Sequence, residues 1–197
     1  MKKREVTITR ETKETKVKVY LNIDGSGRNE ADLPAGFLSH MLDLFAKHGL
    51  FDLKILAKGD LQTDEHHLIE DIGFVLGQAF SQVLGDKAGI KRYGFFILPM
   101  DEVLTTVAVD FSGRCTFNLS CQFSREKVGD LPTELIYDFW DAFAQNAKVN
   151  LFIKVENGRN DHHKIEAIFK ACARAIRMAC EIDKRLQKEI PSTKGVL

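Results

Sequence analysis

A short histidine and glutamate motif that occurs twice constrains this chain more than any other feature. It reads HHLIE at residues 66–70 and HHKIE at residues 162–166. If each copy opens a helix, the first histidine and the glutamate lie one turn apart and share a face. The second histidine then points about 100° around the helix axis from the first. The two imidazoles of one copy therefore suit two different ions, or one ion and one substrate.

The segments that precede the two motifs also repeat. Residues 40–48 (HMLDLFAKH) can be laid on residues 138–146 (DFWDAFAQN), and a strand pattern follows each segment. Each half of the chain thus reads as strands, helix, strand and helix. The overlay also places Asp138 where the first half has His40.

The predicted fold class is α+β, with two similar fused halves, each a mainly antiparallel sheet with two helices on one face. The halves are expected to span residues 1–90 and 91–197 and to form one compact domain. Ser39 and Thr133 are the expected helix N-caps. Alternating and helical patterns predict strands at residues 4–10, 14–23, 28–33, 50–58, 92–98, 102–111, 115–123 and 149–156, and helices at residues 37–49, 66–84, from about 131, and 162–182.

The composition argues against several classes of function. Lysine plus arginine and aspartate plus glutamate are 28 each, so the basic excess typical of nucleic-acid-binding proteins is missing. No apolar run approaches 18 residues, and no apolar run follows the basic N-terminus, so we expect neither a membrane span nor a signal peptide. The four cysteines form no C-x-x-C pair, which fits reduced thiols in a cytoplasmic protein.

All six histidines lie in or beside the repeated segments. Imidazole and carboxylate without a nearby cysteine are ligands for Mn, Fe, Co, Ni or Zn. A single motif would also fit a solvated helix start, where a glutamate complements the helix dipole. Two copies at equivalent positions favour metal binding, and they suggest two ions.

A second set of polar residues suggests that the chain binds phosphate. Cations, a hydroxyl group and free backbone N–H groups are the groups that hold such an anion, although each cation alone would equally fit an ordinary surface. Carboxylates at turns and strand starts become candidate proton carriers if a metal site lies beside them. The candidates for phosphate binding are Arg92, Arg114, Lys170 and the tail at residues 192–195, and the carboxylates are Glu14, Asp101 and Glu102.

The chain resembles the imidazoleglycerol-phosphate dehydratase family of histidine biosynthesis over nearly its whole length. The matching motifs occur in one order, which makes chance agreement improbable. They are residues 36–42 (GFLSHML), 48–52, 59–71, 84–87, 99–102, 112–114, 160–171 and 191–195.

The resemblance implies a ribosomal protein S5 domain 2-like fold, two Mn²⁺ ions per active site, and active sites at subunit contacts of a homo-oligomer of about 24 subunits built from trimers. The implied metal ligands, with Asp138 added from the overlay, are His40, His66, His67, Glu70, Asp138, His162, His163 and Glu166. The implied phosphate ligands are Arg92, Arg114, Lys170, Ser192 and Lys194. Glu14 would act near the reacting carbons, and His48 and Asp101 are further catalytic candidates.

The chain departs from the family pattern at three positions. Ser39 replaces an acidic or amide residue, Asp138 stands where histidine is frequent, and Phe152 replaces a common histidine. Phe152 is expected to face the core. An aspartate can still bind a metal through oxygen, so Asp138 remains a candidate ligand.

The expected reaction is loss of water from imidazole glycerol phosphate, with Glu14 as the base that removes a carbon-bound proton. Two alternatives use the same residues. A dinuclear hydrolase would activate water and release a cleaved product such as phosphate. A non-catalytic assembly protein would bind metal between subunits and turn nothing over. At this length, we expect no fused phosphatase domain.

Overall fold

The computed structural model describes residues 3–186 and 189–197. The first half holds β1 (Glu5–Glu11), β2 (Thr15–Asn22), β3 (Asn29–Asp32), α1 (Gly36–Gly49), β4 (Asp52–Gly59) and α2 (His66–Leu84). The second half holds β5 (Tyr93–Met100), β6 (Val103–Asp110), β7 (Thr116–Ser120), β8 (Lys127–Val128), β9 (Leu131–Pro132), α3 (Leu135–Ala147), β10 (Asn150–Asn157) and α4 (Asp161–Cys180). Within these described ranges, no helix has both the length and the apolar character needed to cross a membrane.

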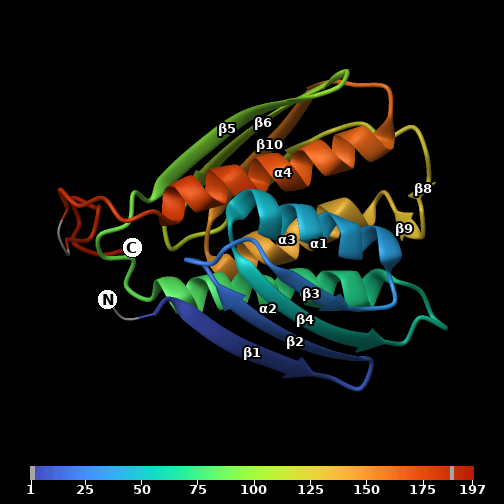
Figure 1. Cartoon of the computed structure of the whole chain (residues 1–197), viewed down its shortest axis with the longest axis horizontal. Helices are drawn as coiled ribbons and strands as arrows, with labels where there is room; N and C mark the ends of the chain where they lie inside the picture. Colours follow the sequence, from blue (N-terminus) through green and yellow to red (C-terminus); the bar gives the residue numbers. More distant parts are fainter. Residues whose placement is uncertain (1–2, 187–188) are drawn as a thin grey trace.

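The two halves have the same sheet topology. The first sheet has the order β1-β2-β4-β3, and the second has the order β5-β6-β10-β7. In both sheets the first three strands are antiparallel, and the last strand runs parallel to its neighbour. The predicted α+β fold with two similar halves is therefore confirmed (Figure 1).

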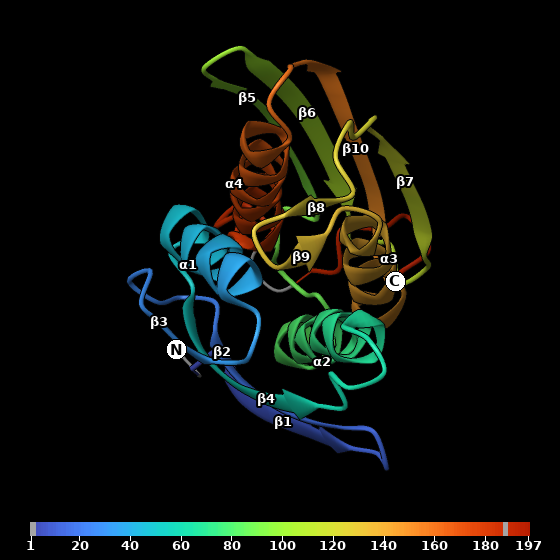
Figure 2. The same cartoon turned by 90° about the vertical axis from the view of Figure 1, so that its right-hand side faces the viewer.

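The helices lie between the two sheets (Figure 2). α1 and α2 pack on the first sheet, and α3 and α4 pack on the second. The helices also pair across the halves, α2 with α3 and α1 with α4. One hydrophobic core is therefore shared by both halves, and side chains at the start of a helix in one half can meet side chains from the other.

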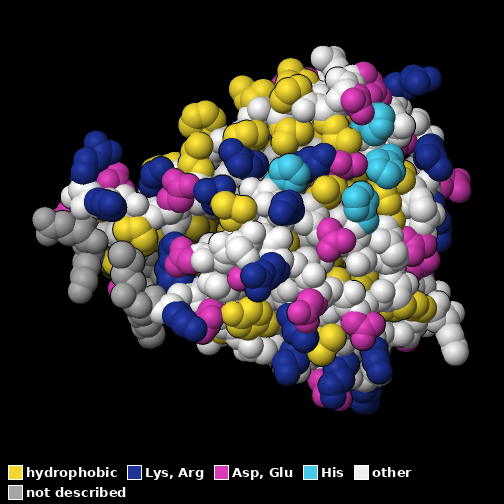
Figure 3. Space-filling view, viewed as in Figure 1, with side chains coloured by type: hydrophobic (Ala, Val, Ile, Leu, Met, Phe, Trp, Pro, Cys, Tyr) yellow, Lys and Arg dark blue, Asp and Glu magenta, His cyan; other side chains and the backbone are white. Residues whose placement is uncertain are grey.

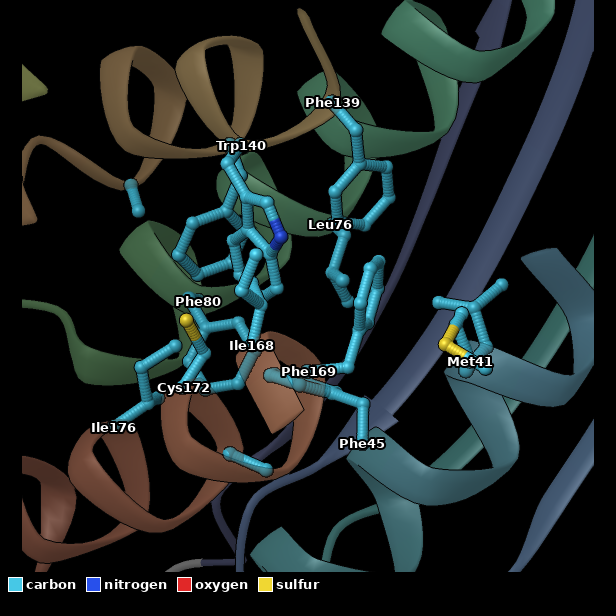
Figure 4. Packing of buried hydrophobic residues seen from close by; sticks show 14 of the residues in the cluster. Met41, Phe45, Leu76, Phe80, Phe139, Trp140, Ile168, Phe169, Cys172 and Ile176 are labelled. Carbon is cyan, nitrogen blue, oxygen red and sulfur yellow. The ribbon is translucent and has the colours of Figure 1, made fainter. Parts of the chain in front are cut away.

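Aromatic rings fill the middle of this core (Figure 4). Trp140 of α3 is fully buried, and its ring centroid lies 4.9 Å from that of Phe169 on α4 and 5.9 Å from that of Phe45 on α1. Phe80 of α2 completes the cluster through Phe45, at 6.2 Å. Rings from all four helices thus hold the helix layer together.

Two glycines let α2 and α3 approach closely. A Cβ atom on Gly73 would lie 2.3 Å from the carbonyl oxygen of Phe139, and one on Gly77 would lie 2.4 Å from that of Phe143. Because the two glycines are four residues apart, they lie on one face of α2. The start of α2 is therefore held near the start of α3.

The prediction that Ser39 caps its helix was wrong. α1 begins at Gly36, and its N-cap position, Ala35, offers no side-chain hydrogen bond. The carboxylate of Asp130 instead accepts hydrogen bonds from the N–H groups of Gly36 and Phe37, at 2.5 and 2.9 Å. A residue far along the chain thus satisfies the free N–H groups of the first turn.

The expected helix start near residue 131 was also wrong. Leu131 and Pro132 form β9, which pairs with β8 around Gly129, and Gly129 adopts the positive φ of 61° that such a turn requires. α3 begins only at Leu135, and the Thr133 hydroxyl donates to the carbonyl oxygen of Arg125 rather than capping a helix.

Phe152 does not face the core as expected. Side chains alternate along a strand, and in β10 the buried neighbours Leu151 and Ile153 face the helices. Phe152 therefore lies on the outer face of the second sheet, with 48% of its surface exposed.

Candidate active site

A cluster of two histidines and a glutamate lies where α1 meets α4. His40, His162 and Glu166 offer ligand atoms that all lie within 4.8 Å of one another. The His162 Nε2 atom is 3.3 Å from Glu166 Oε2, and the rings of His40 and His162 are 6.2 Å apart. We call these three residues cluster A. Histidines gather at this end of the molecule (Figure 3).

The start of α4 is firmly anchored beneath cluster A. The Asn160 side chain accepts a hydrogen bond from the backbone N–H of His162 at 3.0 Å. The buried Asp161 carboxylate accepts from the N–H groups of Ser124 and Arg125, at 2.7 and 2.8 Å, and from Lys164 Nζ at 2.8 Å. These contacts fix the first turn of α4, which carries His162.

The charge of Glu166 is also set by its neighbours. Burial alone would raise its pKa, but the paired Lys170 ammonium, His162 and His40 together lower it. Glu166 is thus held as a carboxylate at the centre of cluster A.

A second cluster lies where α2 meets α3. His66 Nε2 is 3.9 Å from Glu70 Oε2, and His66 Nδ1 is 3.7 Å from Asp138 Oδ2. We call these three residues cluster B. Cluster B is the counterpart of cluster A with the roles of the two halves exchanged, and Asp138 takes the place of His40. Its two carboxylates face different ring nitrogens, so a single ion shared by all three residues would require at least one side chain to move.

The second histidine of each motif faces a β-hairpin rather than its own cluster. His67 Nδ1 lies 3.4 Å from Asp60 Oδ1 and 3.8 Å from Glu14 Oε2. The hydrogen bond with Asp60 and the charge of Glu14 raise the pKa of His67. These three residues form another group with ligand atoms within 4.8 Å of one another.

His163 occupies the equivalent position in the second half. Its Nε2 atom is 3.6 Å from Asp101 Oδ2, and its Nδ1 atom is 2.9 Å from Glu102 Oε2. The contact with His163, together with backbone N–H groups led by that of Asn160, lowers the pKa of Glu102 to about 2. The two histidines of each motif therefore face different neighbours, as their separation of about 100° around the helix axis predicted.

The donor types in clusters A and B fit a divalent transition-metal ion. Imidazole nitrogens and carboxylate oxygens are suitable ligands for Mn²⁺ and its neighbours. Each cluster offers three side chains, which leaves coordination positions for a substrate or for further protein ligands. Cys172 and Cys180 are buried in the core, where burial raises the pKa of their thiols, so these two cysteines offer no thiolate.

The predicted phosphate ligands fall into two groups. Lys170 pairs with Glu166 and so lies beside cluster A. Arg92 lies at the far end of α4, where its backbone N–H donates to the carbonyl oxygen of Ala179 at 2.9 Å. Its guanidinium donates to Asp110 at 2.7 Å and to the carbonyl oxygen of Pro191 at 2.9 Å, which ties the C-terminal tail to this end.

The other three phosphate candidates lie with Arg92. Ser192 and Lys194 follow Pro191, and Ser192 Oγ accepts a hydrogen bond from the Lys194 N–H at 3.2 Å. Gly113, next to Arg114, packs against Leu197. At 1.5 Å per residue, the part of α4 between His162 and Ala179 is roughly 26 Å long. Within one chain, these four residues therefore lie far from cluster A.

Sequence comparisons assign the chain to a family. Residues 34–176 match the family model described as imidazoleglycerol-phosphate dehydratase. The chain belongs to the imidazoleglycerol-phosphate dehydratase family. An imidazoleglycerol-phosphate dehydratase of Koribacter versatilis is 51% identical over 98% of this chain and 100% of its own length. Another, from Rhodopirellula baltica, is 54% identical over 98% of this chain and 96% of its own length.

Solved structures agree with this assignment. The imidazoleglycerol-phosphate dehydratase of Staphylococcus aureus superposes with a TM-score of 0.82 at 38% identity and covers 91% of this chain and 99% of its own. The enzyme of Pyrococcus furiosus gives a TM-score of 0.78 at 32% identity and covers 96% of this chain and 100% of its own. The family resemblance predicted from the motifs is thus confirmed.

Two residues differ from the rest of the predicted set: His48 was predicted to be catalytic but lies apart from the clusters, and Asp60 was not predicted. His48 lies two turns beyond His40 on α1, where burial and then the charges of Lys170 and Arg174 lower its pKa. Because it is two turns away from His40 along the helix, His48 lies outside both clusters. Asp60, which contacts His67, was missed from the sequence, although its place in the Gly59-Asp60 turn before α2 was a usable signal.

Proposed function

We propose that this chain converts imidazole glycerol phosphate to imidazole acetol phosphate and water, as a cytoplasmic enzyme of histidine biosynthesis that uses two Mn²⁺ ions per active site. Membership of the dehydratase family supports the reaction. Cluster A carries the proposal of metal dependence, because two imidazoles and a buried carboxylate from both halves converge there.

Clusters A and B would each hold one ion. Bound Mn²⁺ would supply Lewis-acid stabilisation to the substrate as negative charge develops during dehydration. His67 and His163 face away from the clusters of their own chain, toward the β1–β2 and β5–β6 hairpins. We infer that these two imidazoles serve ions whose other ligands come from a second copy.

The distance between the metal end and the phosphate end supports an assembly of copies. Arg92, Ser192 and Lys194 lie roughly 26 Å along α4 from His162. A glycerol phosphate is far too short to bridge that distance. The tail end of one copy would therefore meet the metal end of another, a head-to-tail contact that closes by rotation into rings. We propose trimers of this kind, which associate further to about 24 subunits.

An exposed apolar surface also favours association. Tyr93, Phe95 and Ile97 on β5 are 57%, 64% and 59% exposed. Phe95 pairs with Ala108, and Ala108 pairs with Phe152, so the surface continues across the second sheet. Hydrophobic side chains gather on this part of the molecule (Figure 3). Contiguous apolar surface of this kind commonly marks a protein interface.

Dehydration requires removal of a carbon-bound proton and departure of hydroxide from the neighbouring carbon. Glu14 would take the proton. It lies on the β1–β2 hairpin with more than half of its side chain exposed, 3.8 Å from His67. An exposed carboxylate beside a candidate metal ligand can reach a substrate held between copies. Lys170, next to Glu166, would place a positive charge near the substrate.

The test is incubation of the purified chain with imidazole glycerol phosphate and Mn²⁺. The proposal requires a keto product that keeps its phosphate, and no product once the metal is removed. Release of inorganic phosphate would instead indicate a hydrolase. Metal binding and assembly without turnover would indicate a non-catalytic assembly protein.

A further inference from the structure

Glu102 connects the β5–β6 hairpin to the start of α4 through both of its oxygens. Oε1 accepts hydrogen bonds from the backbone N–H groups of Asn160 and Arg159, at 2.8 and 3.2 Å. Oε2 lies 2.9 Å from Nδ1 of His163. The carboxylate is thus held by the backbone on one side and faces an imidazole on the other.

This contact determines which nitrogen of His163 carries the proton. An ionised carboxylate only accepts hydrogen bonds, so Nδ1 must be the donor. In the neutral ring Nε2 is then unprotonated, and its lone pair is free to bind a cation. Nε2 points toward Asp101, whose carboxylate is 3.6 Å away.

The first half has a longer counterpart of this contact. His67 Nδ1 lies 3.4 Å from Asp60 and 3.8 Å from Glu14, so neither carboxylate approaches it as closely as Glu102 approaches His163. The two repeated motifs therefore differ in how closely a carboxylate approaches Nδ1 of the second histidine.

We propose that Glu102 is a positioning residue that fixes His163 in its Nδ1–H tautomer, so that Nε2 is ready to bind a divalent cation before any ion arrives. The metal-binding part of this inference rests on the proposed function, whereas the tautomer can be measured in the metal-free chain. Hydrogen-bond partners of this kind orient histidine ligands in many metal sites.

Glu102→Gln is the most informative substitution, because it keeps the shape of the side chain. The N–H groups of Asn160 and Arg159 need an acceptor, so the amide oxygen takes the place of Oε1. The NH₂ group then faces His163 and donates to Nδ1. The ring consequently changes to the Nε2–H tautomer, which blocks the nitrogen that the cation needs.

The tautomer is read from nitrogen–proton correlation spectra of the metal-free chain, labelled with ¹⁵N at histidine, at a pH of about 8.5, above the ordinary imidazole pKa. The His163 signals are assigned by their loss in His163→Asn. The parent should show protonated Nδ1, and Glu102→Gln should show protonated Nε2. Glu30→Gln is the matched control, because Glu30 is exposed on β3 and pairs with Lys54; its spectrum should equal that of the parent.

Calorimetric titration with Mn²⁺ then measures affinity. We expect Glu102→Gln to bind about 10- to 100-fold more weakly than the parent at one site, the usual loss for such a partner, and Glu30→Gln to bind normally. A parent His163 protonated at Nε2, or a Glu102→Gln variant with the parent's tautomer and affinity, would overturn the inference. The dehydration assay on the parent tests the proposed function separately, so the two failures are distinguishable.

Discussion

The close approach of α2 and α3 can be tested by adding a single methyl group. In Gly73→Ala the new carbon would lie 2.3 Å from the carbonyl oxygen of Phe139, with the carbonyl carbon of the same residue 3.1 Å away. These are backbone atoms of a helix, so they cannot rotate aside. α3 must therefore move by roughly 1 Å before the contact approaches an ordinary van der Waals distance.

The expected loss of stability follows from two opposing effects. Overpacking a filled core costs about 1–3 kcal/mol. Replacing glycine by alanine inside a helix stabilises the folded chain by up to about 1 kcal/mol, because alanine has the higher helix propensity. Because the clash is with backbone atoms, we take the upper part of the packing cost and expect a net loss of about 1–2 kcal/mol. For a chain of this length, the melting temperature should then fall by about 2–8 °C.

The double variant Gly73→Ala/Gly77→Ala tests whether one movement of α3 relieves both contacts. A Cβ atom on Gly77 meets the carbonyl oxygen of Phe143 at 2.4 Å, so the same outward movement of α3 relieves both contacts. The double variant should consequently lose less stability than the two single variants together, because the sites are coupled.

The assay is thermal unfolding of the metal-free chain, followed by Mn²⁺ titration. Asp138 directly precedes Phe139, so the displacement should draw Asp138 away from His66 and weaken binding at cluster B. Gly36→Ala is the control, because its Cβ would meet only Asp130 Oδ2 at 3.4 Å. The packing argument is refuted if Gly73→Ala has the same melting temperature as the parent and Gly36→Ala. It is also refuted if the double variant loses more stability than the two single variants together.

Four further predictions concern the site and its support. Glu14→Gln should lower turnover by about 100-fold or more with unchanged Mn²⁺ content; near-normal turnover would move the base to another group such as Asp101. Asp138→Ala should weaken Mn²⁺ binding and Asp138→His should retain it, whereas an alanine variant that binds two ions as tightly as the parent would show that Asp138 is no ligand. Chelation should reduce the native mass to that of a smaller oligomer, and Mn²⁺ should restore it; a constant mass after proven metal loss contradicts this. Asp161→Asn should cost about 3 kcal/mol near neutral pH, because it leaves the buried Lys164 ammonium without its charged partner and with only the Gln122 carbonyl oxygen. Burial would raise the pKa of Asp161, but hydrogen bonds led by Lys164 lower it. The parent should therefore keep this contribution to its stability at any pH above the pKa of Asp161 in the unfolded chain. It should lose the contribution as the pH falls through the lower pKa that Asp161 has in the folded chain. Denaturant titrations at a series of acidic pH values measure this loss.

Long periodic elements could be predicted from the sequence, and contacts across the chain could not. The bounds of α2 agree with the prediction because nineteen residues carry a continuous helical pattern. β8 and β9 have two residues each, too few to show a period. The cap of α1 comes from Asp130, 94 residues after Gly36, so no local signal could identify it.

The candidate site shows the same limit. The motif spacing predicted that each first histidine would lie near its glutamate, and the distances from His66 to Glu70 and from His162 to Glu166 are 3.9 and 3.3 Å. Spacing could not predict that Arg92 would lie at the opposite end of α4. That position depends on its contacts with Ala179 and Pro191, which only the folded chain brings together.

The repeat also explains why one substitution at Asp138 is so informative. Cluster A has two imidazoles and one carboxylate, and Lys170 offsets the charge of that carboxylate. Cluster B has one imidazole and two carboxylates, and among the described residues no lysine or arginine pairs with Glu70. Two sites at equivalent positions of the repeat thus present different donors and different net charge to an ion. Asp138→His makes the donor sets alike while the charge difference from Lys170 remains. If both sites of that variant then bound Mn²⁺ equally tightly, the donor set would govern the affinity. If the two affinities still differed, the charge of Lys170 beside cluster A would govern it.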